Sequence, residues 1–394
     1  MRGCYLKSFS AFVIVTVILM AFCNFINQMY RADSKDFWGD ETYSLKNTVQ
    51  GITYLGLLGK GAGRTEANAA PLDYLFTKML DDMKQGVGSF GVSDKVYYRL
   101  WANFVMVFSG FVVICLFVRD IRYSPSSDLV RMFQLLLLMF LPFVYLYRPM
   151  TYHYAAEVRP YALWFALWFI TIAVCSLTHK AKFILALCLS LLAMTMVGSV
   201  FQILSVGIAY FALRWQQNGW KQAIMDCSQV LIVPVFLVVY YAYPASYGHR
   251  NDEPWADAWH RFFILWGHEA IIIPMLLVAI GSLCLSKRTL PMTTGPLAVL
   301  IVFLMGPLIF WATLSRGYFF TERQYIYYDA HRAVFWLGLI NILPFYLEKL
   351  KVPKKQLLAM AVIFALSIPY VFPKKTISMT QVVLQRTMAF MHRR

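Results

Sequence analysis

Apolar runs of about 17–20 residues recur along nearly the whole chain, and they restrict its fold more than any other feature. A helix of that length crosses a hydrocarbon core of about 30 Å. Helices suit this task because each one satisfies its own backbone hydrogen bonds without water. Only 14% of the 394 residues are charged, against roughly a quarter in soluble domains. The sequence therefore predicts an integral, all-α membrane protein.

We expect a polytopic bundle of about 11 membrane-spanning helices, with 1–394 forming a single transmembrane domain. One apolar stretch, 183–213, is interrupted at Gly198-Ser199 and Gln202, so it predicts either one long helix or two short helices joined by a tight turn. The expected spans are residues 9–29, 99–118, 132–148, 160–177, 183–197, 200–213, 223–243, 269–285, 296–315, 333–347 and 356–372.

Basic residues in the short connections indicate the orientation, because Lys and Arg accumulate on the cytoplasmic side. With the N-terminus inside, every expected cytoplasmic connection is basic, provided that 183–213 forms two helices. The net charge of +16 then reflects topology and contact with anionic lipids, and we expect no nucleic acid partner. These residues are Arg2, Lys7, Arg119, Arg122, Arg131, Lys180, Lys182, Arg214, Lys221, Lys287, Arg288, Lys349, Lys351, Lys354 and Lys355.

This topology places three notable segments outside. Residues 30–98 form a large first outer loop, in which PLDYLFTKML predicts an amphipathic interfacial helix with Pro71 in its first turn. Residues 244–268 form a second outer loop, and 374–394 form an interfacial C-terminal tail.

Several motifs of the first 215 residues occur in a specific order along the chain. The acidic pair Asp40-Glu41 follows the first span, a PL-aromatic helix follows at 71, and Arg99-Leu100-Trp101 opens the next span. PFVYLYRPMTYHYAAEVRPYAL then enters the fourth span. This arrangement resembles the polyprenyl-phosphate-sugar-dependent glycosyltransferases of the C-type (GT-C) fold, such as protein O-mannosyltransferases and lipid A aminoarabinose transferases.

The chain departs from that family at three places. Ala70 stands where the family often has a second proline, and Trp101 stands where it often has a proline. The family's Arg-Tyr of the last large outer loop appears here as Arg323-Gln-Tyr325. These differences bear on the subfamily, and therefore on the acceptor.

The resemblance implies an inverting glycosyltransferase. It would move a sugar from a polyprenyl-phosphate donor to a hydroxyl of lipid A, O-antigen, wall glycan or protein. Reaction would take place on the outer, periplasmic face of the plasma (inner) membrane. The expected partners are the donor, the acceptor and membrane lipids.

Such a transfer needs a base near the acceptor hydroxyl, and Asp40 is the candidate. Glu41 would orient the site or raise the pKa of Asp40 through like-charge proximity. A structural alternative is that the pair caps a helix that starts at Thr42, because acidic residues favour a helix N-terminus.

The transfer also needs cationic groups at the leaving phosphate. Arg159, Arg323 and Lys46 are the candidates, because Arg grips phosphate with a planar fork of donors. Glu157, Tyr161 and His153 are expected to support this site. Two alternatives stay open: Glu157 and Arg159 pair to fix helix packing, and Arg323 anchors the chain at the membrane interface.

The second outer loop offers substrate contacts at His249, Asp252 and Glu253, because carboxylates suit sugar hydroxyls. Some C-type enzymes use a divalent cation at the phosphate. The ligand spacing here matches no standard metal site, so we expect no metal cofactor. The alternative is a loop whose tryptophans lie at the bilayer interface.

Three other functions compete with glycosyl transfer. A lipid or polysaccharide transporter (flippase) would usually carry mid-span charges and pseudo-symmetric halves, which the sequence does not show. A polysaccharide polymerase or ligase would place its working Arg and His in a large, late outer loop, and 244–268 is rich in both. A membrane acyltransferase would need a catalytic histidine at a cavity.

Overall fold

The computed structural model describes residues 2–59, 71–123, 127–146, 157–177, 182–196 and 198–245, together with residues 294, 297–298 and 301. Every regular element within these ranges is a helix. The last four expected spans, 244–268 and the tail 374–394 lie almost entirely outside the described residues.

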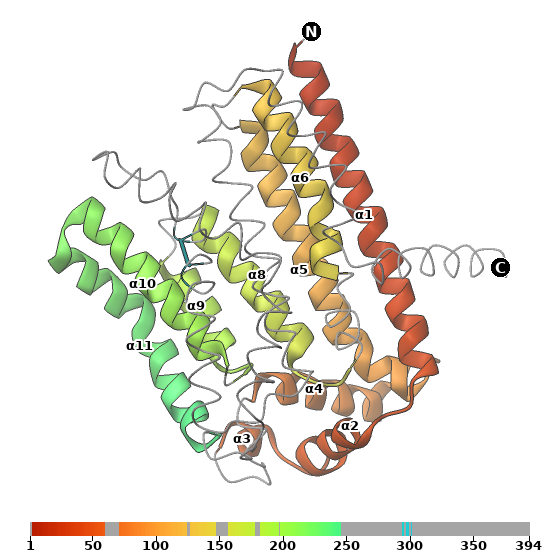
Figure 1. Ribbon diagram of the computed structural model, residues 1–394. Helices are drawn as coiled ribbons and strands as arrows, with labels where there is room; N and C mark the ends of the chain where they lie inside the picture. The colour runs from red at the N-terminus through yellow and green to blue at the C-terminus, as the bar shows by residue number, and fades with distance from the viewer. Residues whose placement is uncertain are drawn as a thin grey trace, which may run out of the picture.

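Long helices form the body of the described chain (Figure 1). Three of them, α1, α5 and α11, are long and apolar enough to cross a membrane, over Tyr5–Ser34, Asp94–Tyr123 and Trp220–Tyr241. The protein is therefore helical, with three candidate membrane-spanning helices in its described part. The long helices are α1 (Arg2–Ser34), α5 (Asp94–Tyr123), α6 (Asp128–Leu146), α8 (Tyr161–Leu177), α9 (Lys182–Ala193), α10 (Ser199–Asn218) and α11 (Trp220–Ala245).

Each of the first seven expected spans falls on one of these helices. Most helices run further than predicted, as α1 does, with 33 residues where 9–29 was expected. The reason is that polar residues continue the helix beyond its apolar centre. Helix α9 ends at Ala193 and α10 begins at Ser199, so the interpretation of 183–213 as two helices is confirmed.

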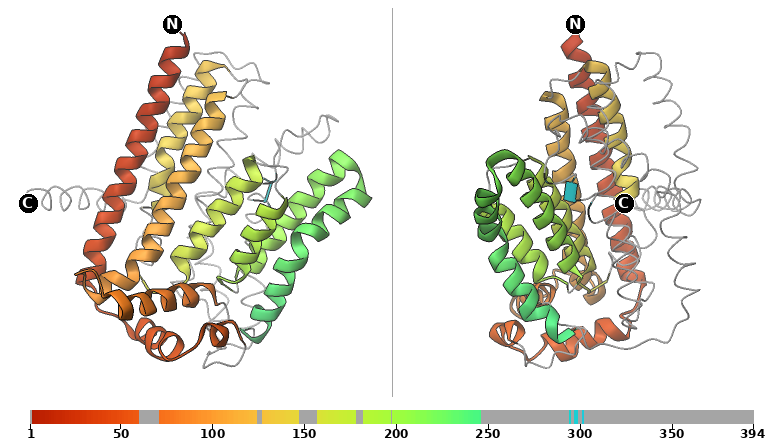
Figure 2. Two further views of the ribbon diagram at one scale, coloured as in Figure 1. Left: turned by 180° about the vertical axis from the view of Figure 1, so that it is seen from behind. Right: turned by 60° about the vertical axis from the view of Figure 1, so that its left-hand side comes forward.

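Helix α8 lies between the group α1, α5 and α6 and the group α9, α10 and α11 (Figures 1 and 2). Its sequence is apolar on all sides, which is typical of a helix surrounded by protein. Trp164, Phe165, Trp168 and Phe169 are each fully buried. This helix is the core of the bundle, and it carries the segment Glu157–Tyr161 at its N-terminal end.

Short helices between α1 and α5 lie across one end of the long helices (Figures 1 and 2). The Leu72 N–H donates to the Met194 carbonyl at 2.9 Å, which fastens the start of α4 to the α9–α10 turn. The Tyr241 hydroxyl donates to the Leu58 carbonyl at 3.1 Å and joins α11 to α3. The short elements are α2 (Gly39–Tyr43), a π-helix η1 (Ser44–Val49), α3 (Tyr54–Leu58) and α4 (Leu72–Val87).

Helix α4 confirms the helix predicted from PLDYLFTKML, with Pro71 immediately before its first residue. Several of its polar side chains lie on the buried side of the helix. Asp73, Thr77 and Asp81 are buried at four-residue spacing. The exposed side instead carries Met79 and Met83, together with Val87. The polar residues of α4 therefore point into the protein. Most of its apolar residues pack there too, and the exposed ones are the three just named.

Labelling from outside tests this arrangement. Gln85 is exposed on α4, whereas Gln216 is exposed near the α10–α11 junction, at the far end of those helices (Figure 1). In a cysteine-free background, we expect a membrane-impermeant maleimide to label Gln85→Cys on intact cells. Gln216→Cys should react only after permeabilisation. Equal labelling of both variants on intact cells would contradict the orientation.

Candidate functional site

An ion pair between Glu41 and Arg99 organises the end of the bundle at which the short helices lie. Both side chains are completely buried. The Arg99 Nε donates to Glu41 Oε1 at 3.0 Å, and its Nη2 donates to Oε2 at 2.6 Å. This parallel, two-bond geometry is the strongest form of an arginine–carboxylate contact. Burying two charges is costly unless they are fully paired, and here each satisfies the other.

Arg99 also completes the C-terminal end of α1, where carbonyls lack helical partners. Its Nη1 donates to the carbonyls of Ala32 and Lys35 at 2.8 and 2.6 Å, and its Nη2 donates to the carbonyl of Asp36 at 3.1 Å. The guanidinium has five N–H groups, and these bonds together with the two to Glu41 use that number. The ring of Phe37 lies 4.9 Å from its central carbon.

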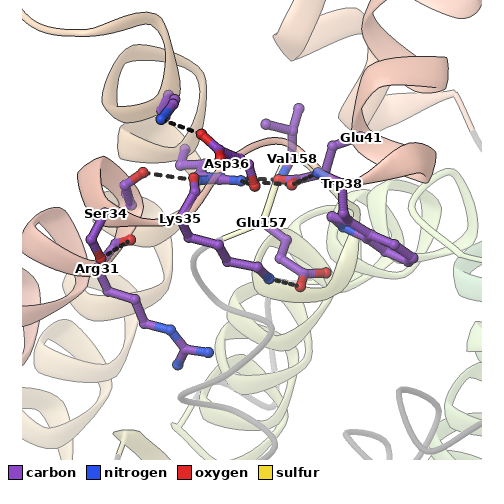
Figure 3. Close-up of polar contacts among 11 residues, drawn as sticks. Arg31, Ser34, Lys35, Asp36, Trp38, Glu41, Glu157 and Val158 are labelled. Carbon is purple, nitrogen blue, oxygen red and sulfur yellow. Dashed lines mark hydrogen bonds and ion pairs between the residues drawn. The ribbon is translucent and has the colours of Figure 1, made fainter.

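Glu41 extends this network to the lead of α8. Its Oε2 accepts the backbone N–H of Trp38 at 3.2 Å, and its Oε1 accepts the backbone N–H of Val158 at 2.8 Å. A salt bridge between the Lys35 Nζ and the Glu157 Oε1, at 2.6 Å, joins the same two segments (Figure 3). Burial raises the pKa of the Glu157 carboxyl, against the lowering effect of Lys35. The end of α1, the start of α2 and the lead of α8 are thereby held together.

Asp40 and Arg159 meet as a consequence. Asp40 directly precedes Glu41, and Arg159 directly follows Val158. These two neighbours are already joined, since Glu41 binds the backbone of Val158. The Arg159 Nη2 lies 3.6 Å from the Asp40 Oδ2. The Asp40 side chain is 40% exposed, whereas that of Arg159 is only 12% exposed. The arrangement offers an accessible carboxylate beside a largely enclosed cation.

Polar groups from three further elements surround Arg159. Ser44, the first residue of the π-helix, lies 3.5 Å from the Arg159 Nη1. Tyr161, at the start of α8, is hydrogen bonded to the guanidinium. Tyr74 of α4 is bonded to Ser44, and burial raises the pKa of Tyr74 to about 12. π-Helical turns are rare and often occur at functional sites, and here the turn brings Ser44 to the cation.

A second carboxyl, Asp73, also feels the Arg159 charge. It is 5% exposed, and its Oδ2 has no hydrogen-bond partner among the described residues. Burial raises its pKa to about 7, although Arg159 acts in the opposite direction. Asp81, on the same face of α4, differs because its carboxylate accepts from the Tyr98 hydroxyl at 2.6 Å and from Gln85 at 2.9 Å.

The structure thus brings together some of the residues predicted for the site. Asp40 and Arg159 are in contact, and Tyr161 joins them. Lys46 is exposed in the π-helical turn, and Ser44 is the residue of that turn that contacts Arg159. The remaining predicted site residues lie outside the described ranges: His153, His249, Asp252, Glu253 and Arg323.

The structure also bears on the two structural alternatives. Helix α2 begins at Gly39 rather than at Thr42, so both acids lie in its first turn, and Glu41 does bond back to the chain at Trp38. The capping interpretation therefore applies to Glu41, whose oxygens serve the fold. The ion pair of Glu157 is with Lys35, while Arg159 faces Asp40.

Sequence reasoning missed the parts of the site that lie on α4 and η1. Ser44, Asp73 and Tyr74 belong to no recognisable motif. A signal for Asp73 was nevertheless present, because Asp73, Thr77 and Asp81 repeat at helical spacing opposite the apolar residues. The described ranges contain no group of three or more His, Cys, Asp or Glu residues that could hold a metal.

Comparisons with protein-family models, with curated proteins and with solved structures returned no match.

The Glu41–Arg99 pair is expected to carry much of the stability of this region. Arg99→Gln leaves the Glu41 carboxylate buried without its cation, which typically costs about 3–5 kcal/mol. Lys84→Gln is the matched control, because it breaks a pair with Asp94 whose side chains are 27% and 57% exposed. That change should cost less than about 1 kcal/mol. Titration of the purified protein with a denaturing detergent measures both, and equal costs would contradict the structural role.

The burial of Asp73 predicts a pH dependence of stability. Its folded pKa of about 7 exceeds the usual value of 3.8, so protons favour the folded state. The stabilising contribution is full below about pH 4 and is lost as the pH rises through about 7. Relative to wild type, Asp73→Asn should therefore gain free energy of unfolding across that interval. Asp82→Asn, which removes an exposed carboxylate on the same helix, should show no such gain.

Proposed function

We propose that the chain is an inverting, membrane-bound glycosyltransferase of the C-type kind. It would transfer a sugar from a polyprenyl-phosphate donor to a hydroxyl acceptor at the outer face of the plasma membrane. In this proposal the chain crosses the membrane about 11 times, as the apolar runs predict. The observation that carries the proposal is the 3.6 Å contact between an accessible Asp40 and an enclosed Arg159.

The chemistry assigns a separate task to each residue. Asp40 accepts the proton of the acceptor hydroxyl as that oxygen attacks the anomeric carbon. The bond from that carbon to the donor phosphate breaks on the opposite side, so the configuration inverts. Arg159 holds the leaving phosphate and stabilises the charge it gains, an effect that is largest where water is excluded. Its low exposure, 12%, suits this task.

Glu41 and Arg99 then act as positioning residues. Glu41 fixes the turn that carries Asp40, and its bond to the Val158 N–H fixes the backbone next to Arg159. Catalytic groups must be held closely in place, because small displacements lower rates strongly. The exposed apolar residues of α4, Met79 and Met83, provide a greasy border for the lipid part of the donor.

The test is turnover of a panel of polyprenyl-phosphate sugars by purified protein with hydroxyl acceptors. Asp40→Asn should lower kcat by about 100-fold or more while donor binding stays unchanged, because general-base catalysis contributes about 10²–10⁴-fold. Asp36→Asn is the matched control, since Asp36 is an exposed carboxylate in the same loop, paired with Lys95. It should retain the wild-type rate.

Two outcomes would contradict the proposal. If Asp40→Asn keeps most of its rate with the sugar bound normally, Asp40 is not the base. If wild type cleaves no donor of the panel while proteoliposomes show lipid or solute translocation, the chain is a transporter instead.

A further inference from the structure

Asp73 holds a position that the proposed transfer does not use. It lies in the first turn of α4, and the Leu72 N–H fastens this turn to the carbonyl of Met194. Its carboxyl is buried, and one of its oxygens has no hydrogen-bond partner in the described part of the chain. Leaving a buried polar atom without a partner is costly, so a native protein seldom keeps one without a reason.

The Arg159 guanidinium has an equivalent feature. Its Nε is buried and has no hydrogen-bond partner among the described residues. Asp40 and Ser44 lie by its Nη atoms, at 3.6 and 3.5 Å, distances that are long for strong bonds. Tyr161 is hydrogen bonded to the guanidinium as well, but the Nε donor stays without a partner in the described part of the chain. The cation therefore retains capacity for an anionic ligand.

The same cation acts on both carboxyls. Arg159 interacts electrostatically with Asp40 and with Asp73. Tyr74 and Tyr161 also face it, while the contact from the α9–α10 turn, the Met194 carbonyl, carries no charge. A ligand phosphate on Arg159 would weaken the pull of the cation on the Asp73 carboxylate and would add a negative charge nearby.

We propose that the Asp73 carboxylate takes up a proton from solvent when a phosphate group binds to Arg159. The negative charge of the ligand then replaces that of the carboxylate beside the cation. The inference rests on the proposed function only in the choice of a phosphate-bearing ligand. An ionised Asp73 competes with the phosphate for the cation. A neutral Asp73 does not compete, and its O–H group can donate a hydrogen bond to a phosphate oxygen. With a pKa of about 7, the carboxyl is poised to change state near neutral pH.

The coupling is reciprocal by linkage. If phosphate binding promotes proton uptake by Asp73, then protonation must tighten phosphate binding by the same factor. Affinity should therefore fall as the pH rises through about 7. In the proposed reaction, this coupling would favour loading of the donor at mildly acidic pH.

The experiment uses the full-length protein in nanodiscs and a geranyl methyl phosphodiester as the probe. A phosphodiester keeps one fixed charge across the range, so any titration belongs to the protein. We expect wild-type affinity to fall about five- to tenfold between about pH 6 and pH 8. Calorimetry in two buffers of different ionisation enthalpy should show uptake of about half a proton near pH 7.5.

Variants assign the effect to one carboxyl. Asp73→Asn should bind the probe with an affinity that hardly changes with pH, whereas Asp82→Asn should behave like wild type. Asp40→Asn should keep the pH dependence, which separates the two carboxyls of the site. Arg159→Gln should lose binding.

The outcomes also separate this inference from the proposed transfer. Binding by wild type without proton uptake would overturn it, and this readout needs no variant. An unchanged pH dependence in Asp73→Asn would overturn it too. The probe carries no sugar, so pH-linked binding without turnover of any donor would reject the glycosyltransferase and leave the role of Asp73 intact.

Discussion

A buried ion pair, Glu41–Arg99, holds together the end of the described bundle at which α2 and α4 lie. Arg99 projects from the second turn of α5 and binds Glu41 through two parallel hydrogen bonds, while its remaining donors cover carbonyls at the end of α1. Both side chains are fully buried, and each can stay ionised there only because the other pairs with it. The pair fixes the course of the chain after α1, and therefore the position of the short helices that follow.

Asp40 and Arg159 inherit their positions from this pair. Glu41 stands next to Asp40 in the chain and binds the backbone next to Arg159. Helix α4 then closes the arrangement by turning Asp73 and Tyr74 inward. Carboxylates beside an enclosed guanidinium suit a ligand that offers both hydroxyl groups and a phosphate. A lipid-linked sugar has both, and the apolar rim of α4 suits its tail.

Much of the fold could be predicted from the sequence, because long apolar runs leave few alternatives to spanning helices. The turn at Gly198 could be predicted too. Small and polar residues interrupt the apolar stretch there, and only a two-helix interpretation leaves the later basic connections on the cytoplasmic side. Arg159 could be predicted because ionisable groups at membrane depth are costly and usually face a protein interior or an aqueous cavity. Asp40 could be predicted because it belongs to an acidic pair directly after the first apolar run. The helix start at Thr42, expected in the capping alternative, was wrong: α2 begins about one turn earlier, at Gly39. Helix ends are the least certain part of such predictions.

Other parts of the site were beyond a linear pattern. Nothing local distinguishes Glu41, which serves the fold, from Asp40, which faces the cation; tertiary partners decide between them. The apolar residues of α4 predicted an amphipathic helix on the membrane surface, and the pattern did not indicate that the helix buries Asp73, Thr77 and Asp81. Their burial depends on tertiary partners, such as the Tyr98 hydroxyl that bonds Asp81, and such partners are not visible in one segment.

The most direct test of the central claim is an experimental structure of the protein in nanodiscs with a bound polyprenyl-phosphate sugar. The proposed site predicts the donor phosphate within hydrogen-bond reach of Arg159, with the anomeric carbon on the side of Asp40 and the prenyl tail along the apolar border of α4. A headgroup bound at the cytoplasmic end of the bundle, or one that leaves Arg159 and Asp40 without ligand contacts, would contradict it.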